Sequence, residues 1–214
     1  MLLMGAKAWF IAGFDGDPKA ILADSPALDR AASLSLAERL LPGATFSEEE
    51  DGGLDFLNPK KREIYVGDYG DLKIVAHADL AKDFPSRIDP RWRNADLGPT
   101  VYLHATHSVV DWGAFALWRN GDLLRAVSVS PDSGIIENVG EQLPFESSFW
   151  DGSHSLGYDE AYPLPFDPLE LAEAALLANL GFQFEGNPDD WVRDPVDIPI
   201  MRLRVSNKAW WKFW

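Results

Sequence analysis

The sequence predicts an α+β fold: a largely antiparallel sheet with an N-terminal β-α-β portion and a late helix packed on the sheet. Asn120-Gly121 separates two apolar runs, and this dipeptide is the strongest short-range signal for a β-hairpin. Apolar residues recur every four positions between 28 and 40, after a short apolar run, which predicts a strand followed by a helix. The segment DPLELAEAALLANLG, 167–181, begins and ends with strong helix signals.

The N-terminal portion begins with KAWFIAGFD, 7–15, whose aromatic and aliphatic residues are typical of a buried strand. Asp17 and Pro18 then supply a helix cap and a first helical residue. The helix is expected over about 18–41, where Pro-Gly ends it, and Asp-Ser-Pro at 24–26 is a point at which it can break.

The hairpin arms supply the centre of the predicted sheet. Apolar side chains of the first arm alternate onto two faces, with Val110, Trp112, Ala114, Ala116 and Trp118 on one and Val109, Phe115 and Leu117 on the other. Because both faces are apolar, this arm is expected to be covered on both sides. Further strands are expected within 63–79, as a pair around 67–71, and at 200–206, as a final edge strand.

The length of 214 residues predicts a single α+β domain over 1–206, followed by an aromatic and basic C-terminal tail at 207–214. The start, MLLMGAKAWFIAGF, lacks the cleavage pattern of a signal peptide, and no apolar stretch approaches the length of about eighteen residues needed to span a bilayer. We therefore expect a cytoplasmic protein with no transmembrane segment.

The chain is acidic, with 34 Asp and Glu against 19 Lys and Arg and a formal net charge of −15. Nucleic acid is not an expected partner, because affinity for phosphate backbones depends on clustered basic residues. The absence of cysteine excludes disulfides, thiolate metal sites and cysteine nucleophiles, and it fits a reducing compartment. The acidity fits a solvated surface, and it also fits a surface for a basic partner.

The stretch VYLHATHSVVDW, 101–112, carries the candidate catalytic residues His104, His107 and Asp111. In a helix these three would share one face, and the two histidines are then candidate ligands for a divalent metal. The β-branched residues of the stretch favour a strand instead, in which His104 and His107 point to opposite faces unless a bulge intervenes. Structural hydrogen bonding is the alternative interpretation of both histidines.

Asp15 and Asp17 are further catalytic candidates, because they follow a predicted strand at the point where a helix begins. Two carboxylates at a strand end suit Mg²⁺ with a phosphate substrate. A turn and a helix cap explain the same residues. The sequence contains no glycine-rich nucleotide motif and no Gly-x-Ser-x-Gly nucleophile elbow.

Aromatic residues are concentrated in two segments that lack periodicity. The segment 142–168 carries the candidate binding residues Trp150, Tyr158 and Tyr162, and the tail carries Trp210, Trp211 and Trp214. An aperiodic segment of this length either packs down on the core or forms a binding lid. For the tail, the alternatives are docking on the domain, contact with a protein partner, and attachment to a membrane interface.

Several segments resemble an uncharacterised family found mostly in actinobacteria. The similarity rests on the Met-Gly-Ala-Lys start at 4–7, on LHATHSVVDW within 103–112 and on PLPFDPLELAEAAL within 163–176, and it covers most of 4–205. The resemblance implies a cytosolic bacterial protein, and it implies no activity.

Three hypotheses of function follow. The first is a cytosolic, non-enzymatic binding or protein-interaction domain, whose partner is a protein or a small molecule. The second is a hydrolase or metal-dependent enzyme that uses His104, His107 and Asp111 with Asp15 and Asp17. Apart from the divalent metal of this second hypothesis, no cofactor is expected. The third is an immunity-type inhibitor of a basic toxin, and the oligomeric state stays open.

Overall fold

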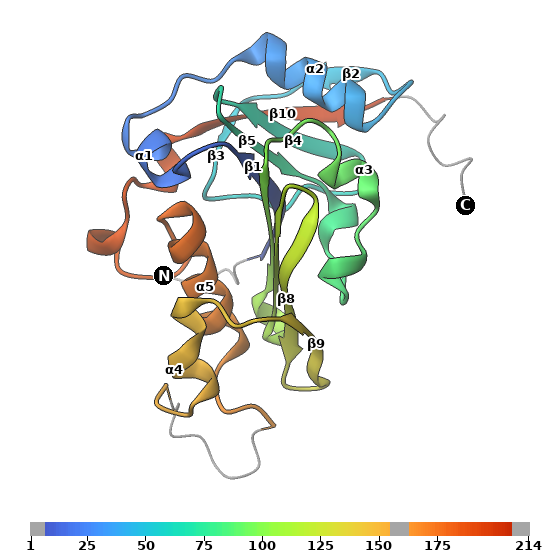
Figure 1. Cartoon of the computed structure of the whole chain (residues 1–214). Coiled ribbons are helices and arrows are strands. Elements are labelled where there is room, and N and C mark those ends of the chain that lie inside the picture. Colours follow the sequence, from blue (N-terminus) through green and yellow to red (C-terminus); the bar gives the residue numbers. More distant parts are fainter. Residues whose placement is uncertain (1–6, 155–162, 207–214) are drawn as a thin grey trace.

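The fold is built around one large antiparallel sheet (Figure 1). The computed structural model describes residues 7–154 and 163–206. Within these residues the strand order is β2-β10-β4-β5-β1-β6-β7-β8-β9, and β3 pairs with β10. The strands are β1 (Lys7–Phe14), β2 (Phe46–Glu48), β3 (Gly52–Gly53), β4 (Glu63–Asp68), β5 (Leu72–Ala76), β6 (Thr100–His107), β7 (Trp112–Arg119), β8 (Asp122–Ser130), β9 (Gly134–Gly140) and β10 (Pro199–Val205). The expected α+β class with a largely antiparallel sheet is confirmed.

Helices cover both faces of the sheet, so two cores form (Figure 1). The described α-helices are α1 (Pro18–Ala23), α2 (Arg30–Leu40), α3 (Pro90–Arg93), α4 (Ser147–Trp150) and α5 (Pro168–Leu180). α1, α4 and α5 pack on one face, and α2 and α3 pack on the other. In the described part of the chain, no helix has the length and apolarity that crossing a membrane requires.

β1 lies near the middle of the sheet, between β5 and β6. Its side chains alternate between the two cores: Phe10 and Ala12 join the core under α5, and Ile11 joins the core under α2. This alternation follows from the two-residue period of a strand. The sequence of the strand is therefore apolar throughout, as expected for a strand with both faces covered.

The structure breaks the first expected helix into two. α1 ends at Ala23 and α2 begins at Arg30, where the Asp29 side chain accepts a hydrogen bond of 2.9 Å from the Ala32 N–H. Ser25 precedes a proline and has a φ of 54°, which is incompatible with a continuous helix.

The expectation that 200–206 form an edge strand is wrong, because β10 lies between β2 and β4. β2 has three residues, of which Ser47 and Glu48 begin the acidic run SEEED at 47–51. Its pairing with β10 joins residues that are far apart in the chain, with Phe46 opposite Val205.

The β7–β8 hairpin forms at Asn120-Gly121, whose φ values of 52° and 87° are those of a type I′ turn. The two faces predicted for the first arm are correct from Trp112 onward. Val109 and Val110 were expected to extend this arm, but they form a 3-10 turn and are 71% and 49% exposed.

α5 packs closely on β7 at Gly113. A side chain at this position would collide with the Pro168 carbonyl oxygen at the start of the helix and would press against Ala172. Asp167 caps the helix by accepting a hydrogen bond of 2.7 Å from the Leu169 N–H, which fixes the same end. The glycine therefore sets the distance between α5 and the sheet.

Replacement of Gly113 by alanine is expected to lower the free energy of unfolding by about 2 kcal/mol, because the added methyl group overpacks a rigid contact. Urea denaturation measures the loss. The control is Gly186→Ala, whose methyl group meets only the Gln183 side chain and should change stability by less than about 0.5 kcal/mol. Equal effects of the two substitutions would contradict the close packing at Gly113.

Candidate functional site

His104 is a core residue. It is fully buried on β6, its Nδ1 lies 3.1 Å from the Tyr102 hydroxyl, and its ring packs against Phe10 and Phe184 with centroid distances of 5.4 and 5.8 Å. Burial lowers the pKa of His104 to about 3. Its Nε2 is also buried and has no hydrogen-bond partner in the described residues. The imidazole is therefore neutral at physiological pH and inaccessible to solvent.

The structure does not bring His104, His107 and Asp111 together. His107 ends β6 and has the opposite parity, so it points to the other face of the sheet. Asp111 lies beyond the next turn, exposed and in the left-handed conformation with a φ of 46°. In the described ranges, no group of three or more His, Asp and Glu side chains is arranged to hold a metal ion.

Asp15 and Asp17 lie at the opposite end of the β1–β6 pair from His107, because Lys7 pairs with His107 and Phe14 pairs with Thr100. Asp15 is exposed. Asp17 caps α1 by accepting a hydrogen bond of 3.0 Å from the Lys19 N–H. These carboxylates and the two histidines therefore occupy separate places.

Trp150 is a packing residue on α4. Its ring meets Phe166 edge-on at 4.9 Å, and its Nε1 donates a hydrogen bond of 3.0 Å to Glu146. The other candidate aromatic residues, Tyr158, Tyr162, Trp210, Trp211 and Trp214, lie outside the described residues.

The two ends of the described sheet differ in how they are protected against pairing with another strand. β2 has three residues and is followed by carboxylates, which are features that discourage pairing. β9, with the sequence GIIENVG, has seven residues and contains neither lysine nor proline. Within the described residues, no strand or loop backbone pairs with the outer side of β9.

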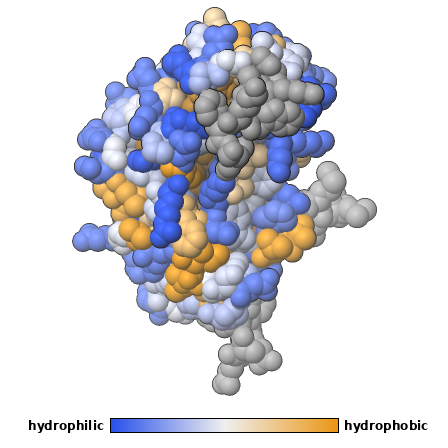
Figure 2. All heavy atoms as spheres, turned by 90° about the vertical axis from the view of Figure 1, so that its right-hand side faces the viewer, coloured by the Kyte–Doolittle hydropathy of each residue, from blue (hydrophilic) through white to orange (hydrophobic). Residues whose placement is uncertain are grey.

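Exposed apolar side chains lie on both faces of β9 and on the two 3-10 turns at 84–87 and 108–110, and we call them the β9 surface. They are Phe84, Val109, Val110, Ile135 and Val139, with exposures of 39%, 71%, 49%, 50% and 43%. Figure 2 shows several separate hydrophobic patches on one face of the molecule, with hydrophilic side chains between them. Exposed apolar side chains beside an unpaired strand edge are a feature of interaction sites.

A hollow of about 480 Å³ opens beside β9. Phe84, Val110, Trp112 and Ile136 contribute apolar walls, and Asp83 and Asp132 contribute carboxylates. Among the described residues, no lysine or arginine lines it. The hollow therefore offers apolar contact and negative charge beside Ile136 of β9.

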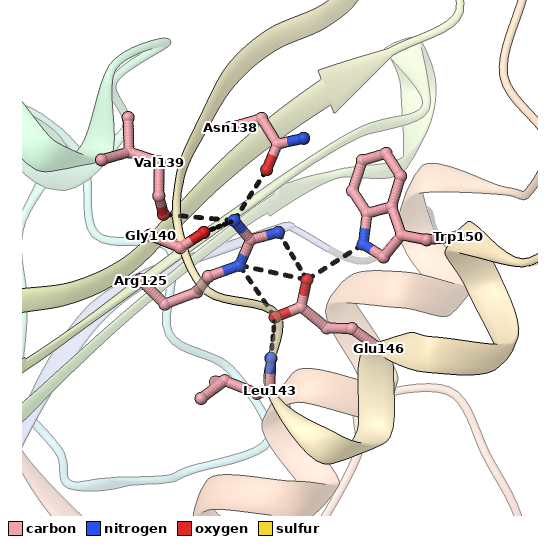
Figure 3. A network of polar contacts seen from close by, with 7 residues as sticks. All are labelled: Arg125, Asn138, Val139, Gly140, Leu143, Glu146 and Trp150. Carbon is pink, nitrogen blue, oxygen red and sulfur yellow. Dashed lines mark hydrogen bonds and ion pairs between the residues drawn. The ribbon is translucent and has the colours of Figure 1, made fainter.

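A buried polar network fixes the far end of β9 (Figure 3). Arg125 on β8 is 1% exposed, and its guanidinium donates to both carboxylate oxygens of the fully buried Glu146, with a shortest distance of 2.6 Å. Its Nη1 also donates to Asn138 and to the carbonyl oxygens of Val139 and Gly140, at 2.7, 3.1 and 3.0 Å. The end of β9 is thereby attached to β8 and to the turn that carries Glu146.

The opposite face of β9 is fixed by Glu137. Its Oε2 accepts a hydrogen bond of 2.9 Å from the Ser86 N–H, and its Oε1 accepts one from the Ser86 hydroxyl. Ser86 belongs to the 3-10 turn η2 (Pro85–Arg87), which follows Phe84. Side chains on both faces of the sheet thus hold the edge strand in place.

The sequence contains a signal for this network in the alternation of the second hairpin arm. Arg125 falls on the same face of the second hairpin arm as Val127, and Val127 is buried. A charged residue at such an inward position requires a buried partner of opposite charge. The identity of that partner is nonlocal, because Glu146 is separated from Arg125 by β9.

Glu173 is another buried carboxyl, and it interrupts the apolar sequence of α5. It lies on α5 at a cleft of about 400 Å³ that is also lined by His154, Glu170 and Glu185. Its Oε2 accepts a hydrogen bond of 2.8 Å from the Phe184 N–H. Burial raises the pKa of Glu173 to about 7.

Replacement of Glu146 by glutamine is expected to reduce the free energy of unfolding by about 3 kcal/mol, because it leaves the buried Arg125 guanidinium without a counter-charge. The control is Glu170→Gln, whose exposed contact with His154 should contribute less than about 1 kcal/mol. The double variant Arg125→Met with Glu146→Leu should regain part of the loss, since an apolar pair removes both buried charges. Losses of similar size for Glu146→Gln and Glu170→Gln in urea denaturation would contradict this account.

Replacement of Glu173 by glutamine is expected to flatten the pH dependence of stability. The pKa of Glu173 is near 4.5 in the unfolded chain and about 7 in the folded chain, so stability is lost as the pH rises through this interval. As the pH rises from 4 to 8, the free energy of unfolding of the variant should increase relative to that of wild type by on the order of 2 kcal/mol. Urea denaturation at these pH values measures the difference, with the exposed Glu38→Gln as control. Parallel profiles for wild type and Glu173→Gln would show that the folded-state pKa is not raised.

The comparisons with known proteins identify a family and no activity. A match to the family described as "Family of unknown function (DUF6928)" covers residues 8–203. No curated protein and no solved structure matches the chain. The resemblance to an uncharacterised family is thus confirmed at the level of the family, and its actinobacterial origin stays a prediction. The chain belongs to the DUF6928 family of unknown function.

Proposed function

We propose that this chain is a protein-interaction domain that binds an extended, basic segment of a partner protein along β9. The observation that carries the proposal is the unprotected outer edge of β9 within the described residues, flanked by exposed apolar side chains. An extended peptide that adds a strand to such an edge gains main-chain hydrogen bonds, and adjacent hollows supply side-chain specificity.

The rigidity of β9 supports this proposal. Arg125 holds one end of the strand through the Val139 and Gly140 carbonyl oxygens, and Ser86 holds Glu137 on the other face. A strand that is ordered before binding costs less conformational entropy when the partner arrives. The network in Figure 3 is therefore consistent with a preorganised docking edge.

The charge of the surface supports a basic partner. Asp83 and Asp132 line the hollow, no basic side chain lines it, and the chain as a whole has a net charge of −15. A segment that alternates apolar residues with lysine or arginine would place apolar side chains in the hollow and its charges near the carboxylates. A basic toxin, bound by an immunity-type inhibitor, is one class of partner with this chemistry.

Selection of a phage-displayed library of random dodecapeptides on the immobilised chain tests the proposal. Peptides that alternate apolar and basic residues are expected to be enriched. Val139→Lys should weaken their binding at least about tenfold, because it adds a repulsive charge to the docking edge. The control is Val196→Lys, which places the same charge at a valine that is 56% exposed on the 3-10 turn η6 (Pro195–Asp197). This turn contacts β3, which pairs with β10 at the end of the sheet opposite β9.

Hydrogen exchange supplies a second readout with the selected peptide. The amides of Gly134–Gly140 should exchange more slowly in the complex, because the outer edge of β9 becomes hydrogen-bonded. If the two lysine variants bind the peptides equally well, or if no peptide is enriched, the assignment of β9 as the docking edge is wrong.

A further inference from the structure

A separate hollow lies near the other end of the sheet, beside β4 and β10. Its volume is about 480 Å³, and its aromatic walls are Trp9, Phe56 and Tyr65. Phe56 is 45% exposed, so this ring faces solvent across the opening. Volume and aromatic lining fall within the range of small-molecule sites.

Arg202 forms part of the same hollow and stacks on its aromatic walls. Arg202 and Tyr65 are directly opposed on β10 and β4, and the guanidinium carbon lies 5.2 Å from the Tyr65 ring centroid and 5.5 Å from that of Phe56. A side chain on Gly52 would collide with the guanidinium, so the absence of a side chain there leaves room for it. The loop and the two rings together hold Arg202 in one place.

The Arg202 guanidinium makes no ion pair and no hydrogen bond within the described part of the chain, and its Nε is buried without a partner. The adjacent carboxylates have other partners: Glu49 pairs with Arg204 at 2.7 Å, and Glu63 accepts hydrogen bonds from the Tyr65 hydroxyl and the Lys60 N–H, at 3.1 and 3.0 Å.

The hollow offers hydrogen-bonding groups of both kinds, and its lining includes three glutamates against one lysine and one arginine. Arg202 and Lys60 are donors, and Glu50 and Asn58 carry acceptors. Asn58 Oδ1 is also buried without a partner. A ligand that fits these groups is flat, carries both donors and acceptors, and has no strong charge of its own.

We propose that this hollow binds an uncharged, planar heteroaromatic ring of the nucleobase type. Such a ring stacks on the exposed Phe56 ring and on the half-buried Trp9 ring, because every base has a π-face. The ring acceptors receive hydrogen bonds from Arg202 and Lys60. The three glutamates that line the hollow, Glu49, Glu50 and Glu63, disfavour a phosphate group, so the ligand is a free base or nucleoside.

Isothermal titration with adenosine and guanosine tests this site, and AMP and ribose serve as comparison ligands. At least one nucleoside is expected to bind with a Kd below about 1 mM. AMP should bind more weakly than adenosine, and ribose should give no heat of binding. Arg202→Gln should weaken nucleoside binding about tenfold, and Phe56→Leu should weaken it severalfold. The matched control is Arg204→Gln, which removes the same charge two residues away on β10, where Arg204 pairs with Glu49.

Three results would overturn the proposal. They are a Kd weaker than about 1 mM for both nucleosides, tighter binding of AMP than of adenosine, and equal weakening by Arg202→Gln and Arg204→Gln. Far-ultraviolet circular dichroism and the unfolding midpoint of each variant show whether it is folded. If Arg202→Gln does not fold, Phe56→Leu and competition by free adenine decide the question with the folded protein.

Discussion

The buried ion pair between Arg125 and Glu146 is the interaction on which the β8–β9 end of the molecule depends. Both side chains are removed from water, and moving two charges into the protein interior costs several kcal/mol for each ion. The cost is offset only when the remaining donors and acceptors are used. Here the Arg125 guanidinium also binds three oxygens at the end of β9, and Glu146 also accepts from the Leu143 N–H and Trp150 Nε1. One pair of charges thus determines where an edge strand, a turn and α4 meet.

The sequence predicts those parts of the fold that depend on local interactions. The Asn120-Gly121 turn and the α5 start at Asp167 and Pro168 require only residues a few positions apart, and both appear as predicted from the sequence. The position of β10 depends instead on pairing with β2, whose sequence is short and acidic, so no local pattern indicates it. The partner of Arg125 cannot be predicted for the same reason. The alternation of inward and outward residues along β8 predicts that Arg125 is buried, but its partner, Glu146, lies beyond β9 in the sequence.

The candidate site was less predictable than the fold because its residues are defined by exposure. His104 and His107 are candidate site residues from the sequence. In the structure they point to opposite faces of the sheet, and burial keeps His104 neutral. The residues of the β9 surface are three valines, one isoleucine and one phenylalanine, which in sequence are indistinguishable from core residues. Only the sheet order shows that β9 has no neighbour on its outer side within the described chain. A site made of apolar residues that fail to be buried has no sequence motif.

The net charge gives a physical reason why an unprotected edge can be tolerated. A long edge strand with exposed apolar side chains normally promotes association with a second copy of the same chain. Two copies that each have a charge of −15 repel one another, and Asp83 and Asp132 place part of that charge beside β9. The same field attracts a basic segment and accelerates its encounter with the edge. In the proposed interaction, acidity spread over the whole chain takes the protective role that lysine or proline takes in other edge strands, and it leaves β9 able to pair with a partner of opposite charge.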